Sequence, residues 1–250
     1  YLELMRQSYT GCNPRGLMLA HDKALCKQIL LYHRIPTPRF AVFPRRQVVK
    51  RPKYLRFPLL VKSAVEEAST GISQASIVTN DEKFLDRVNF IHEQVQSDAI
   101  VEHYIDGREL YVGIIGNRRL QTFPVWEMLF TKMPDHVQRI ATARVKFNPD
   151  YQKKYGIRTQ AAKDLPPGAE ERILHLCKRV YRVLSLSGYA RLDLRMRKDG
   201  RVYVLEANPN PNLEYGEDFA ESAEAADVSY ETLLHRILGL GFSYRAAWRG

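Results

Sequence analysis

Apolar residues recur at helical spacing in several stretches of the chain, and each stretch is bounded by residues that start or stop helices. Residues 22–33 predict a helix that ends before the proline-containing segment 35–38. Thr79 and Glu82 fit a capping box for a second helix, and Ser229 fits an N-cap for the last one. The residues at helical spacing are Phe84, Val88, Ile91 and Val95, whose face is expected in the core, and Ile173, Cys177, Val180, Tyr181 and Leu184, which mark a further amphipathic helix. The last predicted helix carries Leu233, Leu234 and Ile237.

Short apolar runs between turn residues predict strands. The predicted strands are residues 58–62, 72–78 and 99–104, followed by a hairpin of residues 109–115 and 120–126. Residues 131–165 are polar with weak periodicity, which in a compact domain is typical of a functional or mobile loop. Because helices are mixed with antiparallel hairpins, the pattern favours α+β lobes over a doubly wound sheet.

The most informative stretch is residues 188–208, a predicted hairpin with its turn at residues 199–200. Counting back from this turn places Asp193 opposite Glu206. The other predicted pairs are Lys198 with Arg201 and Arg191 with Asn208 on the polar face, and Leu192 with Ala207, Leu194 with Leu205 and Met196 with Tyr203 on the apolar face. Because the apolar face must cover a core, burial sets the register and forces the two carboxylates together.

Facing carboxylates repel unless a cation lies between them. Asp193, Glu206 and Asn208 offer hard oxygen ligands, which suit Mg²⁺ or Mn²⁺ better than Zn²⁺. A solvated charged face with an ion pair of Arg191 and Asp193 is the simpler alternative. The rigid, proline-containing loop 208–212 favours the metal site. If this pair holds a catalytic metal, Glu206→Gln is expected to abolish enzymatic turnover and to leave the unliganded protein as stable or slightly more stable.

Length and composition permit one large domain or two small lobes, since 45% of the 250 residues are hydrophobic and 26% are charged. No stretch approaches the ~20 apolar residues that span a bilayer. No secretory signal is visible, so a cytoplasmic location without membrane association is predicted. The three cysteines, Cys12, Cys26 and Cys177, form no CxxC pair and are expected to be reduced packing residues.

The net charge of +10 favours anionic partners such as nucleotides or phosphorylated intermediates. The densest basic cluster, residues 45–56, is broken by prolines and holds few aromatic residues. An exposed linker is therefore favoured there over a nucleic-acid surface. Lys62 ends an apolar strand, where a buried cation needs an anionic partner. The segment 66–72 that follows is rich in small residues and could close its backbone amides over phosphate.

Taken in order, these segments resemble the ATP-grasp superfamily, and specifically the D-alanine-D-alanine ligases. The matching segments are His21-Asp22-Lys23, Phe57 to Lys62, Glu66 to Ile72, Glu102 to Glu109, Lys154-Tyr155, Arg191 to Asp193, and Leu205 to Asn208. The resemblance extends over residues 9–239 and implies two α+β lobes that hold ATP between them. We accordingly assign residues 1–20 to the remnant of an upstream segment, 21–107 to an N-terminal lobe, and 108–250 to a C-terminal lobe.

The resemblance implies an ATP- and Mg²⁺-dependent ligase that joins a small carboxylate to an amine, such as an amino acid or peptide, through an acyl phosphate. The implied roles are Lys23 and Lys62 at the α- and β-phosphates, Glu102 with the backbone of His103 and Ile105 at adenine, Glu109 at ribose, Lys154 at the γ-phosphate, Asp193, Glu206 and Asn208 at Mg²⁺, and Arg191 at the acyl-phosphate oxygens. Arg191 and Lys154 are the residues assigned to catalysis. A homodimer is compatible with this assignment.

The chain also departs from the family's pattern. An additional N-terminal domain of the ligases is expected to be absent or truncated here. A serine of the small-residue loop is replaced by Ala68, a glycine that faces the tetrahedral intermediate falls at Asn212, and a serine that grips the second substrate's carboxylate falls at Glu217. Because Glu217 and Asp218 would repel a carboxylate, we expect retained chemistry with a different substrate specificity.

Two other classes of protein compete with a ligase. One is a non-catalytic ATP-binding module with a regulatory or scaffold role and the same fold. The intact set of Arg191, Asp193, Glu206 and Asn208 argues against it, since a pure binder need not keep a full metal site. The other is a basic nucleic-acid-binding protein, which no recognised binding motif supports.

Overall fold

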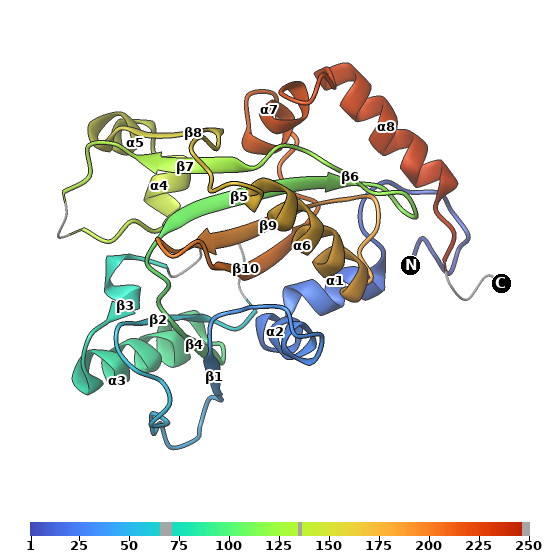
Figure 1. The fold of residues 1–250 in the computed structure, drawn as a ribbon. Helices are drawn as coiled ribbons and strands as arrows, with labels where there is room; N and C mark the ends of the chain where they lie inside the picture. The colour runs from blue at the N-terminus through green and yellow to red at the C-terminus, as the bar shows by residue number, and fades with distance from the viewer. Residues whose placement is uncertain (66–71, 135–136, 247–250) are drawn as a thin grey trace.

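The computed structural model describes residues 1–65, 72–134 and 137–246, which form two antiparallel sheets covered by helices (Figure 1). The smaller sheet contains β1 (Phe40–Phe43), β2 (Leu59–Ser63), β3 (Ile77–Val78) and β4 (Ala99–His103), in the order β1-β4-β2-β3. Helix α3 (Asp81–Phe90) and the π-helical turn η2 (Ile91–Val95) pack on it, preceded by the short 3-10 helix η1 (Gln74–Ser76). As predicted, Phe84, Val88 and Ile91 are buried in this core.

The larger sheet contains β5 (Arg108–Ile115), β6 (Gln121–Thr122), β7 (Trp126–Phe130), β8 (Ile157–Ala161), β9 (Tyr189–Met196) and β10 (Val202–Pro209). Its order is β10-β9-β5-β7-β8, and β6 pairs with the end of β5. Successive side chains of a strand point to opposite faces. Leu192, Leu194 and Met196 of β9 therefore face a buried core, while Asp193 and Arg195 lie on the other face of the sheet.

The core behind the larger sheet is closed by α1 (Pro14–His21), α2 (Lys23–Tyr32) and α6 (Ala169–Val183). The predicted face of α6 is buried here, including Ile173 and Cys177. Helix α2 is capped by Asp22, whose side chain accepts from the Leu25 amide at 2.9 Å. Residues 14–35 thus share a core with the larger sheet, although they precede the smaller one along the chain.

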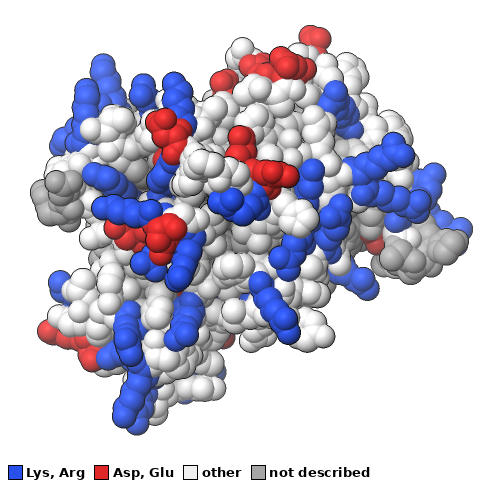
Figure 2. Space-filling view, in the orientation of Figure 1, with Lys and Arg blue, Asp and Glu red and all other residues white. Residues whose placement is uncertain are grey.

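The remaining helices lie on other parts of the larger sheet. Helices α7 (Asp218–Glu224) and α8 (Tyr230–Ser243) form a separate core with the end of β5, the start of β9 and Phe123, which follows β6. Helices α4 (Ala143–Phe147) and α5 (Pro149–Tyr155) lie beside β7 and β8. No helix of the described residues is long and apolar enough to cross a membrane. Lys and Arg side chains are spread over most of one face of the molecule rather than gathered in one patch (Figure 2).

Four local predictions are wrong. Of the predicted strand 120–126, only Gln121–Thr122 forms the hairpin with β5, and Trp126 begins the next strand, β7. Asn80, not Thr79, caps α3, because it immediately precedes the first helical residue and its side chain accepts from the Lys83 amide at 2.9 Å. Only residues 77–78 of the predicted strand 72–78 are extended in the sheet, since η1 takes up the residues before them. The segment 131–165 is not a structureless loop: its described residues include α4, α5 and β8.

The hairpin of β9 and β10 contains two departures from the predicted register, and they cancel. The turn has three residues rather than two, because the amide of Arg197 donates to the carbonyl of Arg201 and Gly200 takes a φ of 78°. A β-bulge at Leu205 then restores the count. The pairs of Leu194 with Leu205, Met196 with Tyr203 and Lys198 with Arg201 were wrong, whereas those of Leu192 with Ala207, Arg191 with Asn208 and Asp193 with Glu206 are confirmed.

Candidate active site

The carboxylate pair lies on the polar face of the β9–β10 hairpin. Asp193 is buried at 4% exposure and accepts two hydrogen bonds from Arg191, at 2.8 and 3.0 Å. The Glu206 carboxylate lies 4.0 Å from Nζ of Lys62, which comes from β2 of the other sheet. Asn208 buries its Nδ2 without a hydrogen-bond partner in the described part of the chain. Two carboxylates and an uncommitted amide form an oxygen-donor set that fits Mg²⁺.

The pKa values of the two carboxylates shift in opposite directions. Burial raises the pKa of Asp193, and the facing Glu206 adds to this rise, although Arg191 opposes it. Burial also opposes ionisation of Glu206, but the positive charges of Lys62, Lys23 and Lys146 outweigh it and lower its pKa to about 2. Glu206 is therefore ionised at neutral pH without any metal, because lysines supply the neutralising charge.

A second carboxylate, Glu102 of β4, is held between two lysines. Its Oε1 lies 3.0 Å from Nζ of Lys62, and its Oε2 lies 3.3 Å from Nζ of Lys27. All three side chains are at most 6% exposed. Burial opposes ionisation of Glu102, but the two lysines outweigh it and lower its pKa. Glu102, which the resemblance assigns to adenine, is thus already paired with two lysines of the protein.

Lys27 is a site residue that sequence reasoning missed. It lies on α2, one helical turn after Lys23, and this spacing was the available signal. Its Nζ also donates to the Leu205 carbonyl and the Thr37 hydroxyl, both at 3.0 Å. Lys27 therefore links α2 to β4 and to the bulge of β10, and it joins the two sheets beside the carboxylate pair.

One pocket unites most of the residues predicted to bind nucleotide. The predicted residues that line it are Lys62, Glu102, His103, Ile105, Glu109, Asp193 and Glu206. It has a volume of about 80 Å³, and its wall includes Ile140 and Ala141 from the segment before α4. Arg195, which sequence reasoning also missed, enters this pocket from β9. The alternation of β9 was the signal, since Arg195 shares a face with Asp193.

A second pocket of about 420 Å³ adjoins the first, and Lys146 and Glu206 line both. The predicted residues that line it are Arg191, Glu206, Asn208, Asn212 and Glu217. Asp218 also lines it, but one of its oxygens lies 3.7 Å from Arg191. Arg191 therefore compensates part of the negative charge of the Glu217–Asp218 pair, through its contact with Asp218.

Two predicted residues lie apart from these pockets. Lys154 is exposed on α5, with its Nζ 5.2 Å from the ring centre of Tyr155, and the lysine of this segment that lines both pockets is Lys146. Lys23 is buried at the start of α2, and its charge lowers the pKa of Glu206. The small-residue loop with Ala68 lies outside the described residues.

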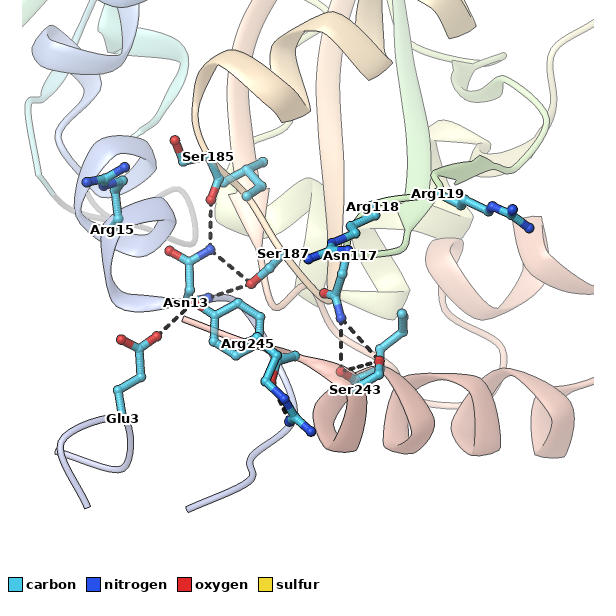
Figure 3. Close-up of a pocket in the computed structure, with 13 residues that line it drawn as sticks. Glu3, Asn13, Arg15, Asn117, Arg118, Arg119, Ser185, Ser187, Ser243 and Arg245 are labelled. Atoms are coloured by element: carbon cyan, nitrogen blue, oxygen red, sulfur yellow. Dashed lines mark hydrogen bonds between the residues drawn. The ribbon is translucent and has the colours of Figure 1, made fainter. Parts of the chain in front are cut away.

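A further pocket of about 740 Å³ lies between the N-terminal segment, the β5–β6 connection and the end of α8 (Figure 3). Arg15, Arg118, Arg119 and Arg245 line it, and Figure 3 shows them spaced apart from one another. Asn13 is fixed there by hydrogen bonds to Ser185 and Ser187. The predicted nucleotide and metal residues do not line this pocket, so the candidate active site is the cleft between the two sheets.

Two antiparallel sheets, with Lys62 of one facing Glu206 of the other across a cleft, define an α+β protein of the ATP-grasp class. The family described as D-ala D-ala ligase C-terminus matches residues 30–239. The chain belongs to this family, as the sequence resemblance predicted.

Similar proteins agree with this assignment. The chain is 30% identical over 241 residues to the protein y4sG of Sinorhizobium fredii (strain NBRC 101917 / NGR234), covering 95% of this chain and 67% of that protein. It is 30% identical over 242 residues to a D-alanine–D-alanine ligase of Bordetella avium (strain 197N), covering 95% and 71%. The crystal structure of a Bacillus anthracis D-alanine–D-alanine ligase complexed with ATP has a TM-score of 0.78 at 24% identity, covering 96% and 72%, which shows the shared fold.

Proposed function

We propose that this chain forms the catalytic part of an ATP- and Mg²⁺-dependent carboxylate–amine ligase that acts through an acyl phosphate. The observation that carries the proposal is the facing pair of Asp193 and Glu206, beside Asn208 and opposite Lys62 across the cleft. A lysine on one wall and oxygen donors on the other suit a polyphosphate with its metal. The family assignment and the ATP in the related B. anthracis structure support the same function.

The residues around the cleft would divide the work of phosphoryl transfer, which needs positioning and charge neutralisation more than covalent help. Lys62 and Lys23 would hold the α- and β-phosphates. Asp193, Glu206 and Asn208 would hold Mg²⁺, which when bound neutralises charge on the transferring phosphoryl group. Lys154 would reach the γ-phosphate, a role that requires α5 to move toward the cleft.

The reaction proceeds in two displacements. A carboxylate oxygen of the first substrate attacks the γ-phosphorus of ATP, and ADP leaves. The amine nitrogen of the second substrate then attacks the acyl carbon, phosphate leaves, and the nitrogen gives up a proton. Arg191, which lines the pocket of about 420 Å³, would stabilise the negative charge on the acyl-phosphate oxygens. Closure of the cleft keeps water from the acyl phosphate.

The substrates are proposed to differ from two D-alanines. Glu217 lines the pocket of about 420 Å³, which we take as the substrate pocket. Burial, together with the charges of Asp218 and Glu214, raises the pKa of Glu217. A negative group there disfavours an acceptor with a free carboxylate and favours a neutral or cationic amine.

An ADP-release assay with Mg²⁺ and a panel of amino acids and short peptides tests the ligase. Turnover should require both an acid and an amine. In parallel, calorimetry with ADP should show Lys62→Ala binding about 10- to 100-fold more weakly, since a charge-assisted phosphate contact is lost. Lys83→Ala, an exposed lysine on α3, is the matched control and should bind normally. Unchanged affinity in Lys62→Ala would refute the phosphate assignment. ADP binding without turnover on any substrate would instead favour a regulatory ATP-binding module.

A further inference from the structure

Arg195 lies inside the proposed nucleotide pocket and is paired there with protein groups. The register of β5 and β9 places it directly opposite Glu109. Its side chain is 4% exposed, and Nη2 lies 2.5 Å from Oε2 of Glu109. Nη1 donates to the backbone carbonyls of Gly107 and Ile105, at 3.2 and 3.4 Å. Nη2 also donates to the carbonyl of Arg139, so the guanidinium is held from several sides.

Glu109, in turn, has both carboxylate oxygens engaged. Oε2 accepts from Arg195, and Oε1 accepts from the hydroxyl of Tyr111 at 3.0 Å. The residue is 6% exposed. Under the proposed function, Glu109 is the carboxylate available to recognise ribose hydroxyls, so this prior engagement bears directly on sugar recognition.

The typical strengths of a hydrogen bond and of a buried ion pair indicate which partner Glu109 keeps. A hydrogen bond from a sugar hydroxyl to a carboxylate contributes on the order of 10- to 100-fold in affinity. Separating a buried ion pair costs on the order of 10²- to 10³-fold, because it leaves uncompensated charge. A sugar hydroxyl is therefore not expected to break this pair. It could use only the lone pairs that remain on Glu109, and a carboxylate whose charge Arg195 already compensates gives little extra affinity to a nucleotide that carries ribose hydroxyls.

We propose that Arg195 is a specificity-determining residue that withdraws Glu109 from sugar recognition, so that the pocket binds nucleotides with and without ribose hydroxyls about equally. This inference rests on the proposed function, because it assumes that the pocket binds a nucleotide. It assigns Arg195 a role in the choice of nucleotide rather than in the chemistry of ligation.

Calorimetry with ADP and with 2′,3′-dideoxy-ADP tests the inference in the presence of Mg²⁺ and without the acid or amine substrate. The wild-type chain should bind the two nucleotides with affinities within about threefold of each other. Arg195→Met frees Glu109 to accept from ribose and should prefer ADP by about tenfold or more. The double variant Arg195→Met/Glu109→Gln is the matched control. It removes both charges and should return the ratio to about threefold.

The outcomes separate the two proposals. A wild-type preference for ADP of tenfold or more would overturn the role of Arg195, and so would an unchanged ratio in a folded Arg195→Met. If that variant does not fold, the wild-type ratio decides alone. Failure of both nucleotides to bind the wild-type chain would instead refute the proposed function.

Discussion

The pKa of Glu206 is set by the surrounding lysines more than by Asp193, the residue that faces it. The sequence placed it opposite Asp193 and led to the expectation that removing its charge would relieve repulsion. The structure adds Lys62, 4.0 Å away, and two more lysines whose charges lower the pKa of Glu206 to about 2. The dominant neighbours of Glu206 are therefore cations.

We now expect Glu206→Gln to abolish ATP turnover and to lower the free energy of unfolding of the unliganded protein at pH 7 by about 1 kcal/mol, because the lysines lose their counter-ion. This reverses the sign expected from the sequence. Denaturant unfolding and the ADP-release assay measure the two effects. The exposed Glu224→Gln is the control and should change neither. Normal turnover by Glu206→Gln would place the metal site elsewhere.

The same pKa shift predicts a pH dependence for this variant. The pKa of Glu206 is lower in the folded protein, about 2, than its ordinary value of 4.5. Its stabilising contribution is therefore complete above about pH 4.5 and is lost as pH falls toward 2. The difference in unfolding free energy between wild type and Glu206→Gln should shrink between pH 6 and pH 3. A difference that stays constant over this range would show that the charge of Glu206 does not stabilise the fold.

At the scale of elements, the segment 131–165 has the form of a lid with its own secondary structure. It is held near the smaller sheet by two hydrogen bonds between Gln74 and Gln138, of 2.9 and 3.1 Å. Ile140 and Ala141 from this segment close the pocket of about 80 Å³. Ligand sites usually measure ~300 Å³ or more. We therefore expect the segment to move when a nucleotide enters.

Hydrogen exchange should show this movement. Without nucleotide, residues 131–165 should exchange faster than the sheets, and Mg²⁺-ATP should protect them, including the region of Lys154. Gln74→Ala removes the tether and should speed exchange at residues 137–155 in the nucleotide-free protein. Gln28→Ala, an exposed residue on α2, is the control. Equal protection with and without Mg²⁺-ATP would contradict a lid.

At the scale of the whole molecule, the charge of +10 and the acidic wall of the substrate pocket act on different ligands. The positive charge suits ATP, whereas Glu217 lines the pocket that we propose for the second substrate. We expect Glu217→Gln to raise kcat/KM for an acceptor with a free carboxylate by about fivefold, because one repulsion of about 1 kcal/mol is removed. Glu214→Gln in the same loop is the control. If D-alanine is already the best acceptor of the wild-type chain, this interpretation of the pocket is wrong.

The amino-acid sequence by itself determined which residues meet on the β9–β10 hairpin near the site. The apolar residues Leu192 and Ala207 had to face the core, so Asp193 and Glu206 had to share the other face. That constraint held even though the turn was longer than predicted and Leu205 forms a bulge, because burial rather than the turn fixes register near the site. Helical periodicity identified the buried faces of α3 and α6 for the same reason.

Only the tertiary structure decided which charges neutralise one another across the cleft. Lys27 and Lys62 come from different elements and meet at Glu102, and Arg195 meets Glu109 through the register of β5 with β9. Periodicity reports which face of an element is buried, but not which element lies opposite that face. The partners of buried charges depend on contacts between residues far apart in sequence, and those contacts exist only once the two sheets have packed.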